Sequence, residues 1–236
     1  MAVGSYEKCK RYIEAHSPET ETPVKSKKVY PCITVSRETG AGAQSVGKEL
    51  IKILDSKSEN NESQWTYFDR QLIEKVLEDH HLPKQVSEYM VEDKFRHLSS
   101  AVNVLLGLHP SQWSLLHKTT ETVLQLARMG KVIIVGRGGN IITLKLKNVF
   151  HVRLIAPLEN RIKYIMDVQK MNRQDAEAYI KKEDLARRNY LKSNFSRDIE
   201  NPELYHIVLN TGLLTHEETA TVIADAVLKK FAKLFS

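Results

Sequence analysis

Three arginine side chains stand directly after segments that are typical of buried strands. They are Arg37, Arg70 and Arg137. The carboxyl ends of parallel strands meet at one edge of a sheet, where ligands of such folds bind, so we expect these side chains to converge. Guanidinium groups hold phosphate oxygens bidentately, and several cations around one phosphoryl group are what its transfer requires. Arg137 is the strongest candidate phosphate ligand, although a surface arginine in a tight turn would give the same pattern.

A glycine-rich turn follows the first of these strands. Backbone N–H groups in such a turn, together with the N-terminus of the helix after it, form a site for an anion. The pattern is weak alone, because a tight turn without a ligand has the same composition. The predicted anion-binding residues are Ser36, Arg37, Thr39, Gly40, Ala41, Gly42, Ala43, Gln44 and Ser45.

An acidic residue and two arginines share one predicted helix further along the chain. Asp184 lies three residues before Arg187 and four before Arg188. On a helix these side chains are neighbours, so the carboxylate can orient a guanidinium group. An exposed salt bridge within the helix, which contributes little to stability, remains the alternative.

The elements that must position these residues are strands separated by helices. Runs of β-branched and aromatic residues predict strands at 29–35, 65–68, 132–135, 149–155 and 206–209. Apolar periodicity predicts helices at 5–15, 44–55 and 72–77, and through 82–130 with a break near residue 110. A capping box at Thr215–Glu218 opens a C-terminal helix. This alternation predicts an α/β fold with a parallel sheet covered on both faces.

Composition sets the class of protein but not its partner. The 236 residues are 42% hydrophobic and 27% charged, which suits a soluble globular domain at 29–236, while residues 1–28 form a polar tail or an appended helix. The formal charge of +6 favours an anionic partner: nucleotide, nucleic acid or membrane. Two cysteines, no secretory segment and no apolar span of membrane length predict a cytoplasmic protein that does not bind membranes.

The order of several short motifs carries a family resemblance. They are Ile33-Thr-Val-Ser-Arg-Glu-Thr-Gly-Ala-Gly-Ala-Gln-Ser-Val-Gly47, Tyr67-Phe-Asp-Arg-Gln-Leu-Ile73, Val132-Ile-Ile-Val-Gly-Arg-Gly-Gly139, Ala156-Pro-Leu-Glu-Asn-Arg161, Asp184-Leu-Ala-Arg-Arg-Asn-Tyr190 and Asn210-Thr-Gly212. Over about residues 29–230 the chain resembles the cytidylate kinase-like family of P-loop proteins.

The resemblance implies a nucleoside monophosphate kinase-like fold with a parallel five-stranded sheet. It implies a helical acceptor-binding insertion at 82–130, a lid at about 170–198, and ATP and Mg²⁺ as cofactors. The implied reaction is phosphorylation of a small-molecule nucleotide such as CMP. In that reaction Arg70 and Arg137 would hold the acceptor phosphate, and Asp69 would orient the acceptor or a metal-bound water. For Asp69 and Arg70, a helix N-cap followed by a solvated arginine is the structural alternative.

The resemblance also assigns a role to the lid arginines. One of them would close over the transferring phosphate, and Arg188 fits the register better than Arg187. Arg161 is a further candidate for gripping the donor, with a solvated helix face as its alternative. The predicted catalytic set is therefore Arg37, Arg137, Arg188 and Asp69, and Arg187 is predicted to contact the cofactor.

The phosphate loop departs from the Gly-x-x-x-x-Gly-Lys-Ser/Thr pattern. Ala43 stands where the lysine that reaches the β- and γ-phosphates is expected. Arg37 occupies the place of the first glycine, where its permanent charge can substitute for that lysine. Ser45 is predicted to supply the hydroxyl for Mg²⁺. Gly138 replaces an acid that follows the Gly-Arg pair in cytidylate kinases, and Asp69 is its possible replacement.

These departures leave two functions open, with a third disfavoured. The chain is predicted to be an ATP-dependent kinase or, because the lysine is absent, a catalytically impaired nucleotide-binding module that acts through a protein partner. Nucleic-acid binding is disfavoured because the basic residues are scattered among acids rather than gathered in a stripe. An oligomer is compatible with the sequence.

Overall fold

A computed structural model describes residues 29–57, 64–69 and 112–232. The helices predicted at 5–15 and 72–77, the first part of the insertion at 82–130 and Arg70 lie outside these residues. The described strands are β1 (Cys32–Arg37), β2 (Thr66–Phe68), β3 (Val132–Val135), β4 (Val149–Ile155) and β5 (Ile207–Asn210). The helices are α2 (Ala43–Ser56), α5 (Gln112–Met129), α6 (Gly139–Ile142), α7 (Leu158–Gln169), α8 (Arg173–Phe195) and α9 (His216–Lys230), with a 3₁₀ turn at Pro202–Leu204.

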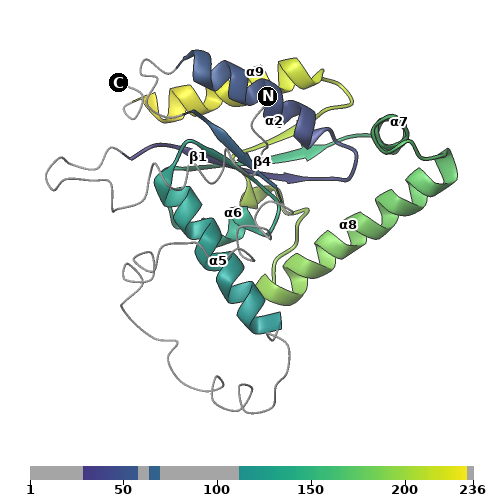
Figure 1. The fold of residues 1–236 in the computed structure, drawn as a ribbon, viewed down its shortest axis with the longest axis horizontal. Coiled ribbons are helices and arrows are strands. Elements are labelled where there is room, and N and C mark those ends of the chain that lie inside the picture. The colour runs from purple at the N-terminus through teal and green to yellow at the C-terminus, as the bar shows by residue number, and fades with distance from the viewer. Residues whose placement is uncertain (1–28, 58–63, 70–111, 233–236) are drawn as a thin grey trace, which may run out of the picture.

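The five strands form one parallel sheet in the order β2-β3-β1-β4-β5, which confirms the predicted fold class. Figure 1 shows α2 and α9 on one face of the sheet and α5 and α6 on the other. Strand β3 therefore contacts apolar side chains on both faces of the sheet, which explains why it is a run of four buried aliphatic residues.

Strand boundaries follow the neighbouring strands rather than local propensity. The first strand begins at Cys32 and not at Val29, because its partners start opposite Cys32, at Val132 of β3 and Val149 of β4. Val29 has no strand beside it and is 47% exposed. The last strand is shifted by one residue, to 207–210, since His206 directs its ring nitrogen to the backbone N–H of His151.

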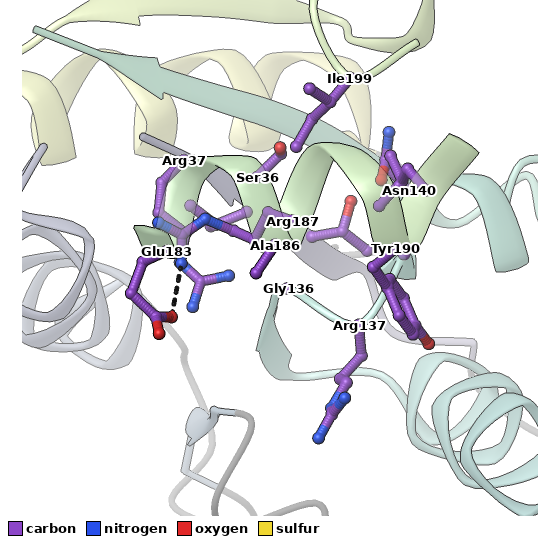
Figure 2. A pocket seen from close by; sticks show the side chains of 14 residues that line it. Ser36, Arg37, Gly136, Arg137, Asn140, Glu183, Ala186, Arg187, Tyr190 and Ile199 are labelled. Atoms are coloured by element: carbon purple, nitrogen blue, oxygen red, sulfur yellow. Dashed lines mark ion pairs between the residues drawn. The ribbon is translucent and has the colours of Figure 1, made fainter. Parts of the chain in front are cut away.

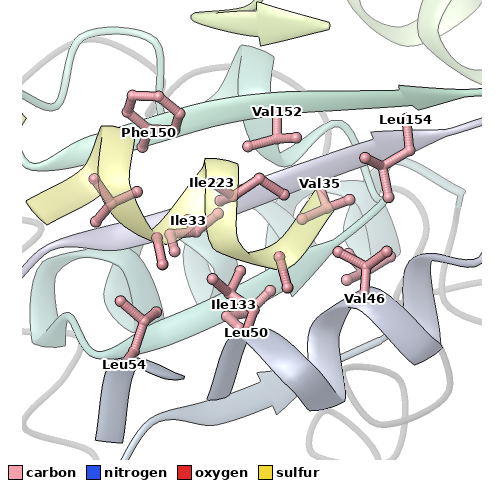
Figure 3. Close-up of a cluster of buried hydrophobic side chains, with 14 of the residues drawn as sticks. Ile33, Val35, Val46, Leu50, Leu54, Ile133, Phe150, Val152, Leu154 and Ile223 are labelled. Carbon is pink, nitrogen blue, oxygen red and sulfur yellow. The ribbon is translucent and has the colours of Figure 1, made fainter. Parts of the chain in front are cut away.

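Two apolar clusters hold the helices to the sheet. The larger one joins Ile33 of β1 and Val152 of β4 to Leu50 of α2 and Ile223 of α9, all of them fully buried (Figure 3). The smaller cluster packs α5 against the other face through Val123 and neighbouring residues.

The predicted capping box opens α9, with the Thr215 hydroxyl and the Glu218 carboxylate bonding each other's backbone N–H groups. None of the helices in the described ranges is long and apolar enough to cross a membrane.

A third, separate cluster joins α7 to α8. Ile162 and Ile165 of α7 pack against Ala176 and Ile180 of α8. Asn172 caps α8 by accepting a hydrogen bond from the backbone N–H of Asp175. The 23-residue helix α8 then runs past the carboxyl edge of the sheet, where it occupies most of the predicted lid (Figure 1).

His151 of β4 is buried within the sheet. Its Nδ1 is 2.8 Å from the hydroxyl of Thr34 on β1. Burial, then the nearby His206 and Lys230, lower the pKa of His151 to about 4. The imidazole is therefore neutral in the folded protein at neutral pH.

The burial of His151 predicts that the folded protein loses stability at acidic pH. Unfolded histidine takes up a proton near pH 6.5, whereas folded His151 does so only near pH 4. The free energy of unfolding should consequently fall as the pH drops through this window. His206, whose pKa burial and Lys230 also lower, contributes in the same direction. Urea unfolding of His151→Asn across the window should give a shallower pH dependence than wild type, and an unchanged slope would contradict the assignment.

Candidate functional site

A cavity of about 200 Å³ lies at the carboxyl ends of β1 and β3. Residues 34–37 of β1 form one wall, and the turn after β3, Gly136–Gly138, forms another. Helix α8 closes it with Glu183, Ala186, Arg187, Tyr190 and Leu191. Figure 2 shows side chains from these separate segments facing one space. The sheet thus brings Arg37 and Arg137 to one cavity, as their positions after strands predict.

Arg37 extends across the end of β3. A Cβ atom on Gly136 would stand 2.3 Å from its Nη1, so the guanidinium depends on a glycine beneath it. Burial, then the adjacent charge of Arg187, lower the pKa of Arg37 to about 10, while Tyr67, Asp69 and Glu183 act in the opposite direction. Arg37 therefore keeps its charge at neutral pH beside a second cation.

Arg137 occupies a turn with an unusual backbone. Gly136, Arg137 and Gly138 have φ values of 86°, 53° and 68°, so three successive residues are left-handed. This conformation is costly for a residue that carries a Cβ. The Arg137 guanidinium carbon lies 5.9 Å from the centre of the Tyr190 ring, and in Figure 2 the side chain extends away from Arg37 and Arg187.

A carboxylate of α8 is bound to the phosphate loop. Asp184 Oδ1 accepts hydrogen bonds from the Thr39 backbone N–H at 2.8 Å and from the Thr39 hydroxyl at 2.7 Å. The same carboxylate accepts from Arg161 Nη1 at 2.6 Å and from Arg187 Nη2 at 2.8 Å. Burial alone would raise the pKa of Asp184, but these hydrogen bonds and the charge of Arg187 lower it.

The two lid arginines have different surroundings. Arg187 lines the cavity, contacts the Thr39 hydroxyl and lies 3.7 Å from Glu183 (Figure 2). Arg188 points elsewhere: its side chain is half exposed and pairs with Glu200 at 2.6 Å. The structure thus places Arg187, and not the Arg188 favoured by the motif register, at the predicted site of transfer.

The glycine-rich loop joins β1 to the N-terminus of α2, as the resemblance implies. Gly40 and Gly42 have φ values of 84° and 72°. A Cβ on Gly40 would stand 2.7 Å from the Arg161 carbonyl oxygen, and one on Gly42 would stand 2.2 Å from His216 Nε2. The loop is therefore packed tightly between α7 and the start of α9.

Side chains of the loop have partners within the chain. The Ser36 hydroxyl accepts from Arg153 Nη1 at 3.2 Å, and Ser45 Oγ is 3.0 Å from the hydroxyl of Tyr164. Gln44, which is exposed, directly follows Ala43, so Ser45 stands one position beyond the one after the expected lysine. Ser45 therefore stands one residue beyond the position where the motif places the Mg²⁺-binding hydroxyl.

The acceptor side of the site is described in part. Asp69 follows β2 and lies close enough to Arg37 to raise its pKa. Arg70, the second residue predicted on the acceptor side, lies outside the described residues. Among the described residues no group of three histidine, cysteine, aspartate or glutamate side chains could hold a metal ion.

Sequence reasoning missed two polar cavity residues on α8, Glu183 and Tyr190. Both share a helix face with Arg187, from which they are separated by four and three residues. The helical period predicts this shared face once Arg187 is placed at the cavity. Asn140, which also lines the cavity, has no comparable signal in the sequence.

The geometry defines a class of protein: a parallel α/β protein whose glycine-rich loop and converging arginines lie at one edge of its sheet. More particularly, the chain belongs to the cytidylate kinase-like family, whose model matches residues 32–213. The match covers every described strand and the loop, which confirms the resemblance.

Three solved structures are similar to this chain at low sequence identity, and the first of them shares its fold. An uncharacterized protein from Eubacterium ventriosum ATCC 27560 is 14% identical, with 84% of this chain and 98% of that chain covered and a TM-score of 0.61. Shikimate kinases from Bacteroides thetaiotaomicron and Acinetobacter baumannii are 13% and 17% identical, with TM-scores of 0.45. These two cover 84% and 86% of this chain and 98% and 96% of their own, and likeness at this level supports no functional conclusion.

One curated relative matches part of the chain. A uronate isomerase from Corynebacterium glutamicum is 24% identical over 114 residues, which are 48% of this chain. The match spans 22% of that enzyme, about a fifth of its length. The isomerase therefore says nothing about the activity of this protein.

The glycine beneath Arg37 can be tested against a matched neighbour. Gly136→Ala places a Cβ in a left-handed residue and against Arg37, so it should destabilise the fold by about 1–2 kcal/mol. Gly139→Ala lies three residues away in α6, where the nearest side-chain atoms are at an ordinary 3.4–3.6 Å. Its unfolding midpoint in urea should match or exceed that of wild type, and equal losses in the two variants would contradict the proposed role of Gly136.

Proposed function

We propose that the protein is an ATP-dependent phosphotransferase acting on a nucleoside monophosphate such as CMP or on a related small acceptor. The observation that carries this proposal is the meeting of Arg37 and Arg187 in one cavity whose wall includes Arg137. These cations come from a strand, a helix and a turn. Transfer of a phosphoryl group depends on positioning and on neutralising its charge, which is what several converging guanidinium groups provide.

Each residue has a proposed role. The loop from Ser36 to Ser45 receives the donor phosphates, with Arg161 beside it. Arg37 and Arg187, whose side chains lie near each other in the cavity, face the transferred group. Asp69, and Arg70 by family resemblance, serve the acceptor, while Arg137 holds the acceptor phosphate after its side chain turns into the cavity.

Mg²⁺ would enter with the nucleotide. This ion keeps several waters and takes most of its remaining ligands from phosphate oxygens, so it does not need an all-protein cage. Its contribution is neutralisation of the donor phosphates. The described side chains bind and orient the nucleotide whether or not they contact the ion.

A second candidate function is a nucleotide-binding module that acts through a protein partner. Ala43 in place of the lysine favours it, and so does the Asp184 carboxylate on the loop N–H of Thr39. Such a protein would bind ATP without turning it over. A thermal shift on addition of ATP or CMP with no phosphoryl transfer would support this function over the kinase.

An acceptor panel tests the kinase. The purified full chain is mixed with ATP, Mg²⁺ and one of CMP, dCMP, UMP or a non-nucleotide alcohol, and ADP release is measured. Acceptor-dependent ADP release above the ATP-only control is expected for at least one nucleoside monophosphate. ATP binding without release for any acceptor would leave the binding module as the better account.

Arginine variants then test the site. Arg37→Ala and Arg187→Ala should each lower turnover at least 100-fold, as expected where a charge acts on the transferring group. Arg137→Ala should abolish acceptor binding or transfer with the fold intact. Arg173→Ala serves as the control, because Arg173 forms an exposed ion pair with Glu159. Normal turnover in Arg187→Ala with a large loss in Arg188→Ala would instead support the register of the motif.

A further inference from the structure

The donor set around Asp184 is the kind that binds phosphate. It consists of one backbone N–H and one hydroxyl from Thr39 and one nitrogen each from Arg161 and Arg187. Loop N–H groups and paired guanidinium groups are typical ligands of phosphate oxygens. In this structure the anion that they hold is a carboxylate from the protein's own helix α8.

Both guanidinium groups at this point are already paired with carboxylates without a ligand. Arg161 lies 3.5 Å from Glu38 and 2.6 Å from Asp184. Arg187 lies 2.8 Å from Asp184 and 3.7 Å from Glu183. Three carboxylates therefore surround two guanidinium groups, so a phosphate cannot join the cluster without repulsion unless a carboxylate leaves.

Asp184 is the carboxylate that must leave. It alone bonds both Thr39 and the two arginines, and its oxygens hold the donors that a phosphate would use. Glu38 accepts instead from the backbone N–H of Ala156, at the end of β4, so it is fixed to the sheet. Asp184 belongs to α8, which packs on α7 through the separate apolar cluster of Ile162 and Ile180.

We propose that Asp184 is a latch: its carboxylate closes α8 onto the phosphate loop and competes with the donor phosphates for Thr39, Arg161 and Arg187. The inference rests on the proposed function, since it concerns how a nucleotide gains access to that same site. A donor polyphosphate displaces the carboxylate, and α8 is released from Thr39. The loop of the ligand-free protein is consequently self-occupied.

The latch is tested by removing one charge at constant shape. Binding of inorganic tripolyphosphate, which carries the donor phosphates without the nucleoside, is measured by titration calorimetry on the full chain. Asp184→Asn should bind it about tenfold more tightly than wild type, because a half-buried competing charge pair is lost. Glu177→Gln removes a charge from the same helix at an exposed pair with Lys181, so its affinity should match wild type.

A second readout does not depend on activity. Without ligand, the backbone amides around residue 184 should exchange with deuterium faster in Asp184→Asn than in wild type, since α8 is no longer held to Thr39. Tripolyphosphate added to wild type should raise exchange there in the same way.

The outcomes separate the latch from the kinase. Equal or weaker tripolyphosphate binding by Asp184→Asn overturns the latch and makes Asp184 a positioning residue for Arg187, whether or not wild type turns over ATP. Tighter binding by the variant together with no ADP release by either protein supports the latch and rejects the kinase. Absence of tripolyphosphate binding to both proteins overturns the latch, and the acceptor panel then judges the kinase by itself.

Discussion

The site depends on how β1 is paired with its two parallel neighbours. Its last pair with β3 is Val35 with Val135, whereas its pairing with β4 continues for two more residues, to Arg37 opposite Leu154. The chain after β3 turns away at Gly136, so β1 overhangs β3 on one side while it stays supported on the other. Arg37 lies in the space above the shorter strand. The unequal strand ends therefore create both the cavity and the position of its first cation.

Much of this arrangement follows from local sequence. The apolar run of β3, the glycine-rich turn and the capping box each act over a few residues, and all were placed correctly. The placement of Arg37 and Arg137 beside one cavity followed from one general property of parallel sheets, the common edge of their carboxyl ends, although the Arg137 side chain extends away from Arg37. Local patterns left the strand order open and placed the first residue of β1 wrongly, at Val29, because both depend on which strands lie beside it.

The choice between Arg187 and Arg188 shows where sequence reasoning stops. Adjacent residues on a helix point about 100° apart, so only one of the two can face the sheet. Which one does so is decided by the packing of α8 on α7, through residues a full turn or more away. The Asp184 contact is harder still to foresee, since it joins residues 145 positions apart through a helix whose own sequence indicates only an intrahelical pair.

Electrostatics supports the proposed anion in the cavity, although the guanidinium groups of the neighbouring cluster are already paired with carboxylates. Burial, and after it the charge of the nearby Arg187, lowers the pKa of Arg37 to about 10. Holding two cations together in an enclosed space costs free energy in the ligand-free protein. The proposed phosphate between them would remove that cost and gain two charge-assisted contacts. Because α7 and α8 share their own apolar cluster and meet the loop through polar groups, exchanging one anion for another at Thr39 leaves the core intact.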